Sequence, residues 1–375
     1  MYGLQVSEDD QLLVETLHGF AEKELRGAAR EAERASATPT GIAAALHRMG
    51  VAAPVPEEFG GQGIPALSSA LRIAEELAWG DPAIALAALT AGHAALLIAE
   101  CGSAAQKTHY LPRFAAESPL RASVLLYEGF GRQPSELETR AKANGVKWTV
   151  TGEKLAVLHP DDAELSVLIA RDLADGALAA FVIEGRPTGW SVTRDDRKVG
   201  KAALEAMPTG SVRLDALELP ADARLAGGTA LARALARVRL THAAVMLGCA
   251  RAAKEFAQGY ANERVAFGRP IAAFQGVAFP LADRDMAIDA ARLELFDVAD
   301  AIAEIDEPAE IENLCRMVVS RCGEVVLQTT RDGVQTLGGH GFIREYPVER
   351  WYRSAAALSA LDFDPLGASV DFISA

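Results

Sequence analysis

Along the first 118 residues, apolar and charged positions recur at helical spacing. Between Ser7 and Ala35, apolar side chains return every three or four residues among many charges, which predicts an amphipathic helix with Ser7 as its N-cap. Three further helices are expected in this part of the chain, over 41–49, 66–79 and 82–100. The loop at 56–63 is rich in glycine, but no strand precedes it and no Gly-Lys-Ser follows. We therefore interpret this loop as a structural join between helices.

The middle of the chain changes to alternation of apolar and polar positions. Six short strands are predicted, over 123–127, 137–143, 146–151, 165–171, 178–183 and 212–217. Two of the joins contain the dipeptides Asn144-Gly145 and Asp175-Gly176, which are typical of hairpin turns. Several short antiparallel strands within about 100 residues predict a small barrel or sandwich.

From residue 226 onward the helical spacing returns. Apolar positions between Leu231 and Phe256 alternate spacings of four and three, which predicts one continuous stripe along a long helix. His242 lies on this stripe, and a lone histidine on an apolar face is more often a hydrogen-bonded core residue than a catalytic one. Two more helices, over 279–304 and 310–337, are expected to complete a bundle. The expected domains are 1–118, 119–225 and 226–375.

Charge excludes two classes of partner. The 375 residues carry a formal net charge of −14, with a pI near 5.1, and half of them are hydrophobic. A large core is therefore expected, while an acidic surface gains nothing from nucleic acid or an anionic membrane. The most apolar window, 83–99, is interrupted by Thr90 and His93, so we interpret it as a buried helix and not as a membrane span.

The cysteines and the amino terminus favour a cytoplasmic location. The four cysteines form no C-x-x-C motif and no cluster with histidine, so neither a zinc site nor a disulfide framework is expected. The first ten residues contain neither a basic stretch nor an apolar one, and no signal peptide is predicted.

A glycine-rich corner follows the last long predicted helix. Gly338, Gly339 and Gly341 allow positive φ and let backbone N–H groups approach a ligand, an arrangement that suits a phosphate. Taken alone, such a corner is more often a plain helix C-cap. The residues around it change that interpretation.

The segment from 335 to 362 resembles the carboxy-terminal signature of the acyl-CoA dehydrogenase family, Q-x-x-G-G-x-G-[FY]-x-x-E-Y-P-V-E-[KR]-x-x-R-D. The matching residues are Gln335, Gly338, Gly339, Gly341, Phe342, Glu345, Tyr346, Pro347, Val348, Glu349, Arg350 and Arg353, whereas Ser354 replaces the aspartate. The resemblance extends over essentially the whole chain. It implies an α+β multidomain protein with the acyl-CoA dehydrogenase fold: an N-terminal all-α domain, a middle β-barrel domain and a C-terminal four-helix bundle.

A second segment resembles the family's flavin-binding hairpin. Asn262–Gln275 matches the pattern R-x-x-F-G-x-x-[IL]-x-x-[FHY]-Q, which implies that these residues reach across a dimer interface to the FAD of a neighbouring subunit. Arg264 would contact the pyrophosphate, while Phe267 and Gln275 would line the adenine and ribityl side. An arginine fork suits a diphosphate, and the Gln335–Gly339 corner would offer backbone donors to the same group. The alternative is that Arg264 is only a helix-end cation at the surface.

The flavin-ring side departs from the family pattern. Where the family has T-E-P-x-A-G-S-D, this chain reads Y-E-G-F-G-R-Q from Tyr127 to Gln133, without the hydroxyls that bond the flavin. The family's K-x-W-I-[TS]-N appears as Lys154 to His159, K-L-A-V-L-H, so Ala156 replaces the tryptophan that packs on the ring. Arg132 is a candidate for part of the lost phosphate contact.

The catalytic base departs as well. The family's glutamate, twelve residues after the basic end of the signature, corresponds to Asp362, which is one methylene shorter. A displacement of about 1 Å can cost on the order of 100-fold in rate. A minority of the family places the base one residue before an arginine that corresponds to Arg239, a substrate-side residue, but Val238 precedes it here. The alternative for Asp362 is an N-cap or a solvated turn carboxylate.

Two functions remain open, and the resemblance implies both. The first is an FAD-dependent acyl-CoA dehydrogenase that desaturates an acyl-CoA at the α,β bond, with Asp362 as base and an electron-transfer flavoprotein as acceptor. The second is a catalytically silent subunit of a heteromeric dehydrogenase, which would lend Arg264, Gln275 and the glycine corner to a partner's FAD. In either case the chain is expected to be a homo-oligomer or a hetero-oligomer. Nothing in the sequence favours a third possibility, a flavin monooxygenase on the same fold.

Overall fold

Helices form the amino-terminal part of the chain. The computed structural model describes residues 8–129, 136–194 and 202–362. The helices of this part are α1 (Glu8–Phe20), α2 (Arg26–Ala35), α3 (Thr40–Arg48), α4 (Leu67–Gly80), α5 (Pro82–Cys101) and α6 (Ala104–Phe114). A π-helical turn, Ala21–Leu25, joins α1 to α2, so the predicted first helix is continuous and contains one widened turn. The expected N-cap at Ser7 lies outside the described residues.

Helix α5 lies in the interior and belongs to two hydrophobic cores. Asp81 begins it by accepting hydrogen bonds from the backbone N–H of Ala83 (3.1 Å) and Ile84 (3.0 Å), with Pro82 at the first helical position. By length and composition α5 could cross a membrane, but 78% of its most apolar window is buried among other helices and the sheet. The interpretation of this window as a buried helix is confirmed.

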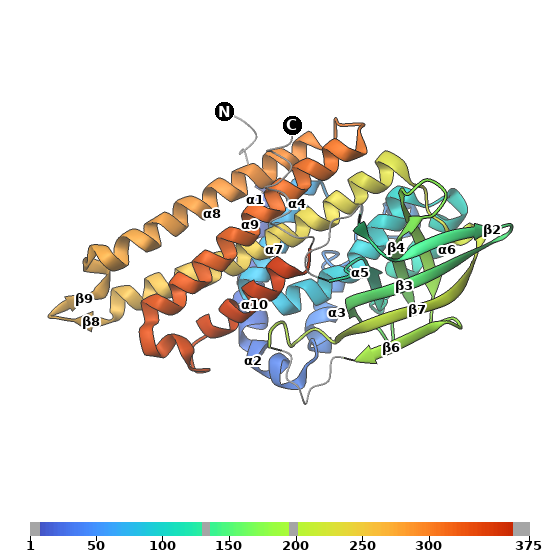
Figure 1. Ribbon diagram of the computed structural model, residues 1–375. Coiled ribbons are helices and arrows are strands. Elements are labelled where there is room, and N and C mark those ends of the chain that lie inside the picture. Colours follow the sequence, from blue (N-terminus) through green and yellow to red (C-terminus); the bar gives the residue numbers. More distant parts are fainter. Residues whose placement is uncertain (1–7, 130–135, 195–201, 363–375) are drawn as a thin grey trace.

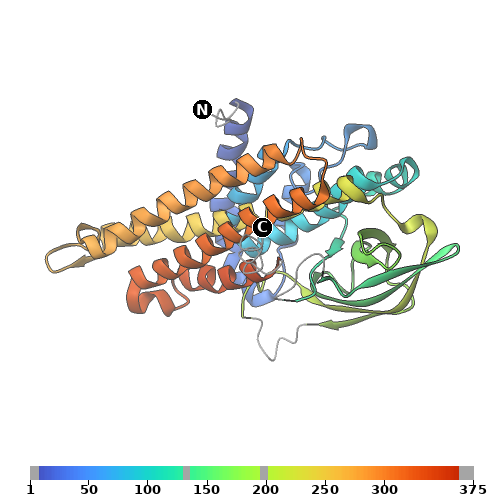
Figure 2. The ribbon, with the colours of Figure 1, turned by 45° about the horizontal axis from the view of Figure 1, so that its top comes forward.

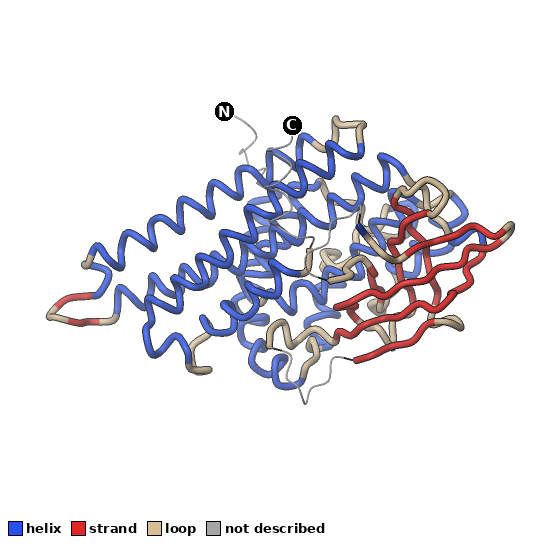
Figure 3. The backbone as a smooth tube through the Cα atoms, in the orientation of Figure 1, coloured by secondary structure: helices blue, strands red, loops and turns tan. Residues whose placement is uncertain are grey.

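A curled sheet forms the middle part (Figure 3). Its strands are β1 (Ala122–Leu125), β2 (Arg140–Asn144), β3 (Lys147–Leu158), β4 (Leu165–Asp172), β5 (Leu178–Glu184), β6 (Trp190–Arg194) and β7 (Thr209–Pro220). They are ordered β1-β4-β2-β3-β7-β6, and β5 pairs with β4. The two hairpins with turns at Asn144-Gly145 and Asp175-Gly176 are confirmed, since β2 pairs antiparallel with β3 and β4 with β5.

Two features of the sheet were not predicted. Strand β3 continues to Leu158, because register shifts after Val150 and after Lys154 keep it paired with β7 although the alternation of its side chains is broken. Strand β6 is a short edge strand. Trp190 and Val192 are half-buried against the core of the sheet while Ser191 and Thr193 are exposed, and this four-residue alternation is at the lower limit for predicting a strand.

The carboxy-terminal part is a bundle of long helices around α7. Its helices are α7 (Gly228–Glu263), α8 (Gln275–Ala301), α9 (Pro308–Leu337) and α10 (Val348–Ala360), with a short 3-10 helix at Gly338–Phe342. With 36 residues, α7 is about 54 Å long and packs against α4, α5, α8, α9 and α10. The sheet lies at one end of this bundle, and a small hairpin, β8 (Val265–Ala266) and β9 (Arg269–Pro270), lies at the other (Figures 1 and 2).

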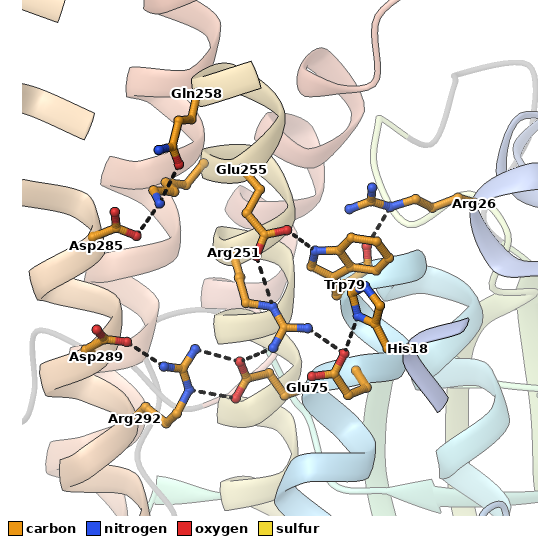
Figure 4. A network of polar contacts seen from close by, with 12 residues as sticks. His18, Arg26, Glu75, Trp79, Arg251, Glu255, Gln258, Asp285, Asp289 and Arg292 are labelled. Atoms are coloured by element: carbon orange, nitrogen blue, oxygen red, sulfur yellow. Dashed lines mark hydrogen bonds and ion pairs between the residues drawn. The ribbon is translucent and has the colours of Figure 1, made fainter. Parts of the chain in front are cut away.

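A buried polar network joins α1 and α4 to α7 and α8 (Figure 4). The Glu75 carboxylate, 5% exposed, accepts hydrogen bonds from Arg251 (3.0 Å) and Arg292 (2.8 Å). The neighbouring Glu76 accepts one from Arg251 (2.6 Å) and contacts His18 (2.9 Å). Burial alone would raise the pKa of Glu75, but its bonds with Arg292 lower it overall. Both carboxylates are therefore paired, which is the condition for burying charge between helices.

Candidate functional site

The structure gathers the six predicted cofactor residues at one end of the bundle. These residues are Arg264, Phe267, Gln275, Gln335, Gly338 and Gly339. They meet because α7 and α9 end where the antiparallel α8 begins, at the end far from the sheet (Figure 1). Two contacts fix this arrangement: the Ile271 N–H donates to the Arg264 carbonyl (2.8 Å), and the Tyr260 hydroxyl bonds His340 Nδ1 (2.7 Å).

The side chains at this end are free to bind a ligand. Arg264, Gln275 and Gln335 are exposed, and within the described part of the chain no hydrogen bond or ion pair engages their side chains. Phe267, at the tip of the hairpin, is 95% exposed. An exposed phenylalanine is costly in water and gains when a partner surface covers it, while the unpaired guanidinium is available to bind an anion.

The glycine corner has the backbone shape that an anion site requires. Gly338 has a φ of +58°, which a residue with a side chain adopts only with strain. A Cβ on Gly339 would meet nothing within 4 Å, so the space above this backbone is open. A Cβ on Gly341 would lie 2.5 Å from the Val334 carbonyl oxygen, so glycine is needed there for close packing. The open backbone of this corner and the unpaired Arg264 guanidinium are the groups that would hold the diphosphate of a flavin dinucleotide.

The second half of the predicted site is a buried ion pair. Arg239 Nε lies 2.8 Å from Asp362 Oδ1, and Arg239 Nη2 lies 2.9 Å from Oδ2, a two-pronged contact. The third nitrogen, Nη1, donates to Glu312 (2.7 Å). Arg239 is 4% and Asp362 6% exposed, so Asp362 is not the solvated turn carboxylate of the alternative interpretation. Although burial opposes it, the Asp362 charge holds the pKa of Arg239 well above its usual value.

The two halves are far apart within one chain. Arg239 and Arg264 are 25 residues apart on α7 (264 − 239), which at 1.5 Å per residue is on the order of 37 Å. That separation exceeds the length of an extended FAD molecule. A flavin held by Arg264 therefore cannot also lie beside Asp362 of the same chain.

The flavin-ring side contains a structural ion pair. Lys154 Nζ lies 2.7 Å from Glu128 Oε1, and both side chains are almost completely buried. Lys154 also donates to the Leu126 carbonyl (3.1 Å), and Glu128 accepts from the Thr139 N–H (3.0 Å). Burial lowers the pKa of Lys154 to about 8, against the opposing charge of Glu128. Glu128 and Lys154, the two residues that still match the family pattern in this region, thus stabilise the sheet domain.

Two of the remaining ring-side positions are filled by apolar residues. Leu158 is 3% exposed and packs in the helical core, and Ala156 lies at the β3 register shift with a φ of +50°. Arg132 lies outside the described residues. The fit to a flavin therefore comes from the diphosphate end of the bundle.

Two histidines lie next to the Arg239–Asp362 pair, and sequence reasoning gave neither a role in the site. His242 on α7 bonds the Leu358 backbone and interacts with the Asp362 charge, while burial lowers its pKa. His93 on α5 interacts with His242, and burial lowers its pKa to about 4. His93 was visible only as a polar interruption of the apolar window, and nothing in the sequence indicates that it meets His242.

His93 is expected to make the protein acid-sensitive. The folded chain keeps this imidazole neutral down to about pH 4, whereas the unfolded chain protonates it near pH 6.5. The unfolded state thus binds more protons in this window, so the free energy of unfolding should fall as the pH drops from 6.5 to about 4. At 1.4 kcal/mol per pH unit the loss reaches about 3 kcal/mol. Urea unfolding across this range measures it.

The matched variants for this prediction are both histidine substitutions. His93→Gln should flatten the pH dependence, whereas His109→Gln, whose side chain is 65% exposed, should leave it unchanged. An unaltered slope in His93→Gln would assign the acid sensitivity to other groups.

Known proteins resemble the chain along nearly its whole length. Models of the acyl-CoA dehydrogenase N-terminal and C-terminal domains match residues 7–118 and 226–362. A probable acyl-CoA dehydrogenase of Mycobacterium leprae is 32% identical over 362 residues, covering 94% of this chain and 91% of the relative. The butyryl-CoA dehydrogenase of Megasphaera elsdenii has a similar structure, with a TM-score of 0.84, 25% identity and 98% of each chain covered.

A second solved structure extends this comparison. A chain of the structure reported for the electron transferring flavoprotein of Acidaminococcus fermentans aligns with a TM-score of 0.85, 26% identity and 98% of each chain covered. The helical, sheet and helical parts therefore have the arrangement of these structures, and the predicted fold class is confirmed.

Proposed function

Because the chain belongs to the acyl-CoA dehydrogenase family, we propose that it is an FAD-dependent enzyme that introduces an α,β double bond into an acyl-CoA thioester. The observation that supports the proposal is the buried Asp362 carboxylate, which Arg239 orients and which the sequence resemblance matches to the family's base. An electron-transfer flavoprotein is the proposed acceptor, in keeping with the source of one similar structure.

Asp362 is the proposed proton acceptor. When FAD is bound, it supplies a hydride acceptor for the β-carbon, and Asp362 takes the α-proton on a carboxylate oxygen. Arg239 engages both oxygens of Asp362, through Nε and Nη2, so Asp362 must turn one oxygen away from Arg239 to face a substrate. Glu312 holds the far side of Arg239 (2.7 Å) and keeps the guanidinium in place during that change.

The flavin is proposed to be shared between two chains. Arg264, Gln275 and the glycine corner of one chain would hold the diphosphate, while Asp362 of its partner would face the substrate. The separation of about 37 Å along α7 supports this arrangement, because neither chain can supply both ends itself. The exposed Phe267 and Phe279, 95% and 59% accessible, gain from the same association.

Flavin absorbance and bleaching test the proposal. The chain expressed alone should be yellow, and an acyl-CoA should bleach its visible flavin band under anaerobic conditions. Asp362→Ala should keep the flavin and lose bleaching by at least about 100-fold in rate, as expected for a lost general base. Asp306→Ala, whose side chain is 95% exposed, is the matched control and should bleach normally.

Two outcomes would contradict the proposal. Full bleaching in Asp362→Ala would remove this carboxylate from the mechanism. A colourless chain that turns yellow only when a homologue is co-expressed would show that the flavin belongs mainly to another subunit.

A further inference from the structure

A histidine lies inside the glycine corner. His340 stands between Gly339 and Gly341, at a position that the family signature leaves open. It belongs to the short 3-10 helix that follows α9, and its side chain is half-buried. Because the other residues of the segment 338–341 are glycines, the imidazole is the only side chain that this segment brings to the corner.

Two tyrosines fix the orientation of this imidazole. The Tyr260 hydroxyl lies 2.7 Å from His340 Nδ1. The rings of His340 and Tyr346 stack, with their centroids 5.2 Å apart and an angle of 18° between their planes. The Tyr260 ring meets the other two edge-on, at 5.9 and 6.1 Å. A hydrogen bond at one nitrogen and a stacked ring together define where the second nitrogen lies.

The second nitrogen, Nε2, is available to a ligand. Within the part of the chain that the structure describes, Nε2 makes no hydrogen bond or ion pair and is not buried. When the Tyr260 hydroxyl donates to Nδ1, the proton of the neutral imidazole lies on Nε2. The ring then presents an N–H donor on the edge opposite Tyr260, and an anionic oxygen is a strong acceptor for such a donor.

This donor belongs to the same face of α7 as Arg264. Tyr260 and Arg264 are four residues apart at the end of α7, a spacing that places two residues on one face of a helix. The Arg264 N–H donates to the Tyr260 carbonyl oxygen (2.8 Å), so the helical hydrogen bonding extends to Arg264. His340 is bonded to Tyr260 by its side chain, while its backbone is part of the glycine corner. It therefore joins the two groups that would hold a diphosphate.

We propose that His340 is a further cofactor-binding residue, whose Nε2–H donates a hydrogen bond to the diphosphate of FAD beside Arg264. The inference rests on the proposed function, because it requires that the chain binds FAD. The competing role is structural: the bond to Tyr260 would only hold the corner against α7, and Nε2 would contact no ligand.

Asparagine and glutamine separate the roles of the two ring nitrogens. In His340→Asn the amide can replace Nδ1 and bond Tyr260, but no atom reaches the Nε2 position. In His340→Gln the longer side chain brings an amide N–H toward the Nε2 position and loses Nδ1. Equilibrium dialysis should give an FAD dissociation constant about 10-fold higher for His340→Asn, the effect of one hydrogen bond to a charged group, and a nearly unchanged one for His340→Gln.

A second ligand and a control variant sharpen this measurement. ADP has the diphosphate without the flavin ring, and it should lose affinity for His340→Asn by a similar factor. His109→Asn changes a histidine whose side chain is 65% exposed and which lies on α6, and it should bind FAD as the wild type does.

Histidine-selective ¹⁵N NMR gives a readout that a structural role would not change. The resonances of His340 are assigned by their loss in His340→Gln. FAD or ADP should shift the Nε2 resonance of the wild-type chain, because the proposed hydrogen bond forms at that nitrogen.

The outcomes separate this inference from the proposed function. If the wild-type chain binds no FAD, the proposed function fails and the inference fails with it. If the wild type binds FAD but His340→Asn binds it as tightly, the imidazole at most holds the corner in place, and the inference is overturned while the function stands. If both variants lose affinity, an Nε2 resonance that FAD leaves unchanged would overturn the inference.

Discussion

The Arg239→Met variant is expected to unfold with about 3–5 kcal/mol less free energy than the wild-type chain. The guanidinium pairs with the buried Asp362 and with Glu312, whose side chain is 33% exposed, and without it Asp362 would stay buried with no counter-charge from this arginine. Leaving a buried charge unpaired costs more than the pair itself contributes. Guanidinium chloride unfolding near neutral pH, followed by circular dichroism, measures the change.

Two further variants give this measurement its control. Arg331→Met removes an arginine on α9 whose side chain is 63% exposed, and it should change the unfolding free energy by less than about 0.5 kcal/mol. The double variant Arg239→Met/Asp362→Leu should recover part of the loss, because it also removes the buried carboxylate that Arg239→Met leaves unpaired. If Arg239→Met loses less than about 1 kcal/mol of unfolding free energy, water or a structural rearrangement compensates for the missing guanidinium.

The second large effect is expected at the other end of α7. Arg264→Ala should weaken FAD binding by about 10-fold to 100-fold, because hydrogen bonds to charged groups contribute about 1.5–3 kcal/mol. The FAD affinity of Arg264→Lys should lie between those of the wild type and Arg264→Ala, since lysine keeps the positive charge but loses the planar guanidinium. Equilibrium dialysis against FAD gives the dissociation constants, and circular dichroism shows whether the helices are intact.

The control for this effect is again Arg331, on the neighbouring helix. Arg331→Ala should bind FAD as the wild-type chain does, because in the described structure its exposed side chain contacts only its neighbours on α9, Gln328 and Asp332. If Arg264→Ala binds FAD as tightly as the wild type, the guanidinium is only a surface cation. The arginine of the hairpin then does not contribute to FAD binding in this chain, although its sequence resembles the family pattern.

Elements with a repeating pattern could be predicted from the sequence. The apolar stripe on α7 identified a long helix, and the apolar window identified the buried α5. The gathering of Arg264, Gln275 and Gln335 also follows from the sequence, because short connections between antiparallel helices bring their ends together. Strand β6 escaped prediction, because the alternation that includes its half-buried Trp190 and Val192 spans only four residues.

Pairings between distant segments could not be predicted. Arg239 and Asp362 are 123 residues apart, and Glu75 and Arg251 are 176 apart. Periodicity shows which face of a helix is buried, but not which residue lies opposite. His93 and His242 are the clearest case, since each appeared in the sequence as a lone polar residue on an apolar face and only the packing of α5 against α7 relates them.

Sharing of one active site between two chains is the central claim, and mixing two inactive variants tests it most directly. Arg264→Ala and Asp362→Ala chains would be co-expressed with different tags, and the mixed oligomers purified on both tags. Anaerobic bleaching by an acyl-CoA would then be measured at an FAD concentration that loads the wild-type chain but leaves Arg264→Ala empty. In a mixed pair, one site combines an intact Arg264 with an intact Asp362, so about half of the wild-type bleaching amplitude is predicted. No bleaching in the mixed oligomer, where each parent alone is inactive, would contradict a site built from two chains.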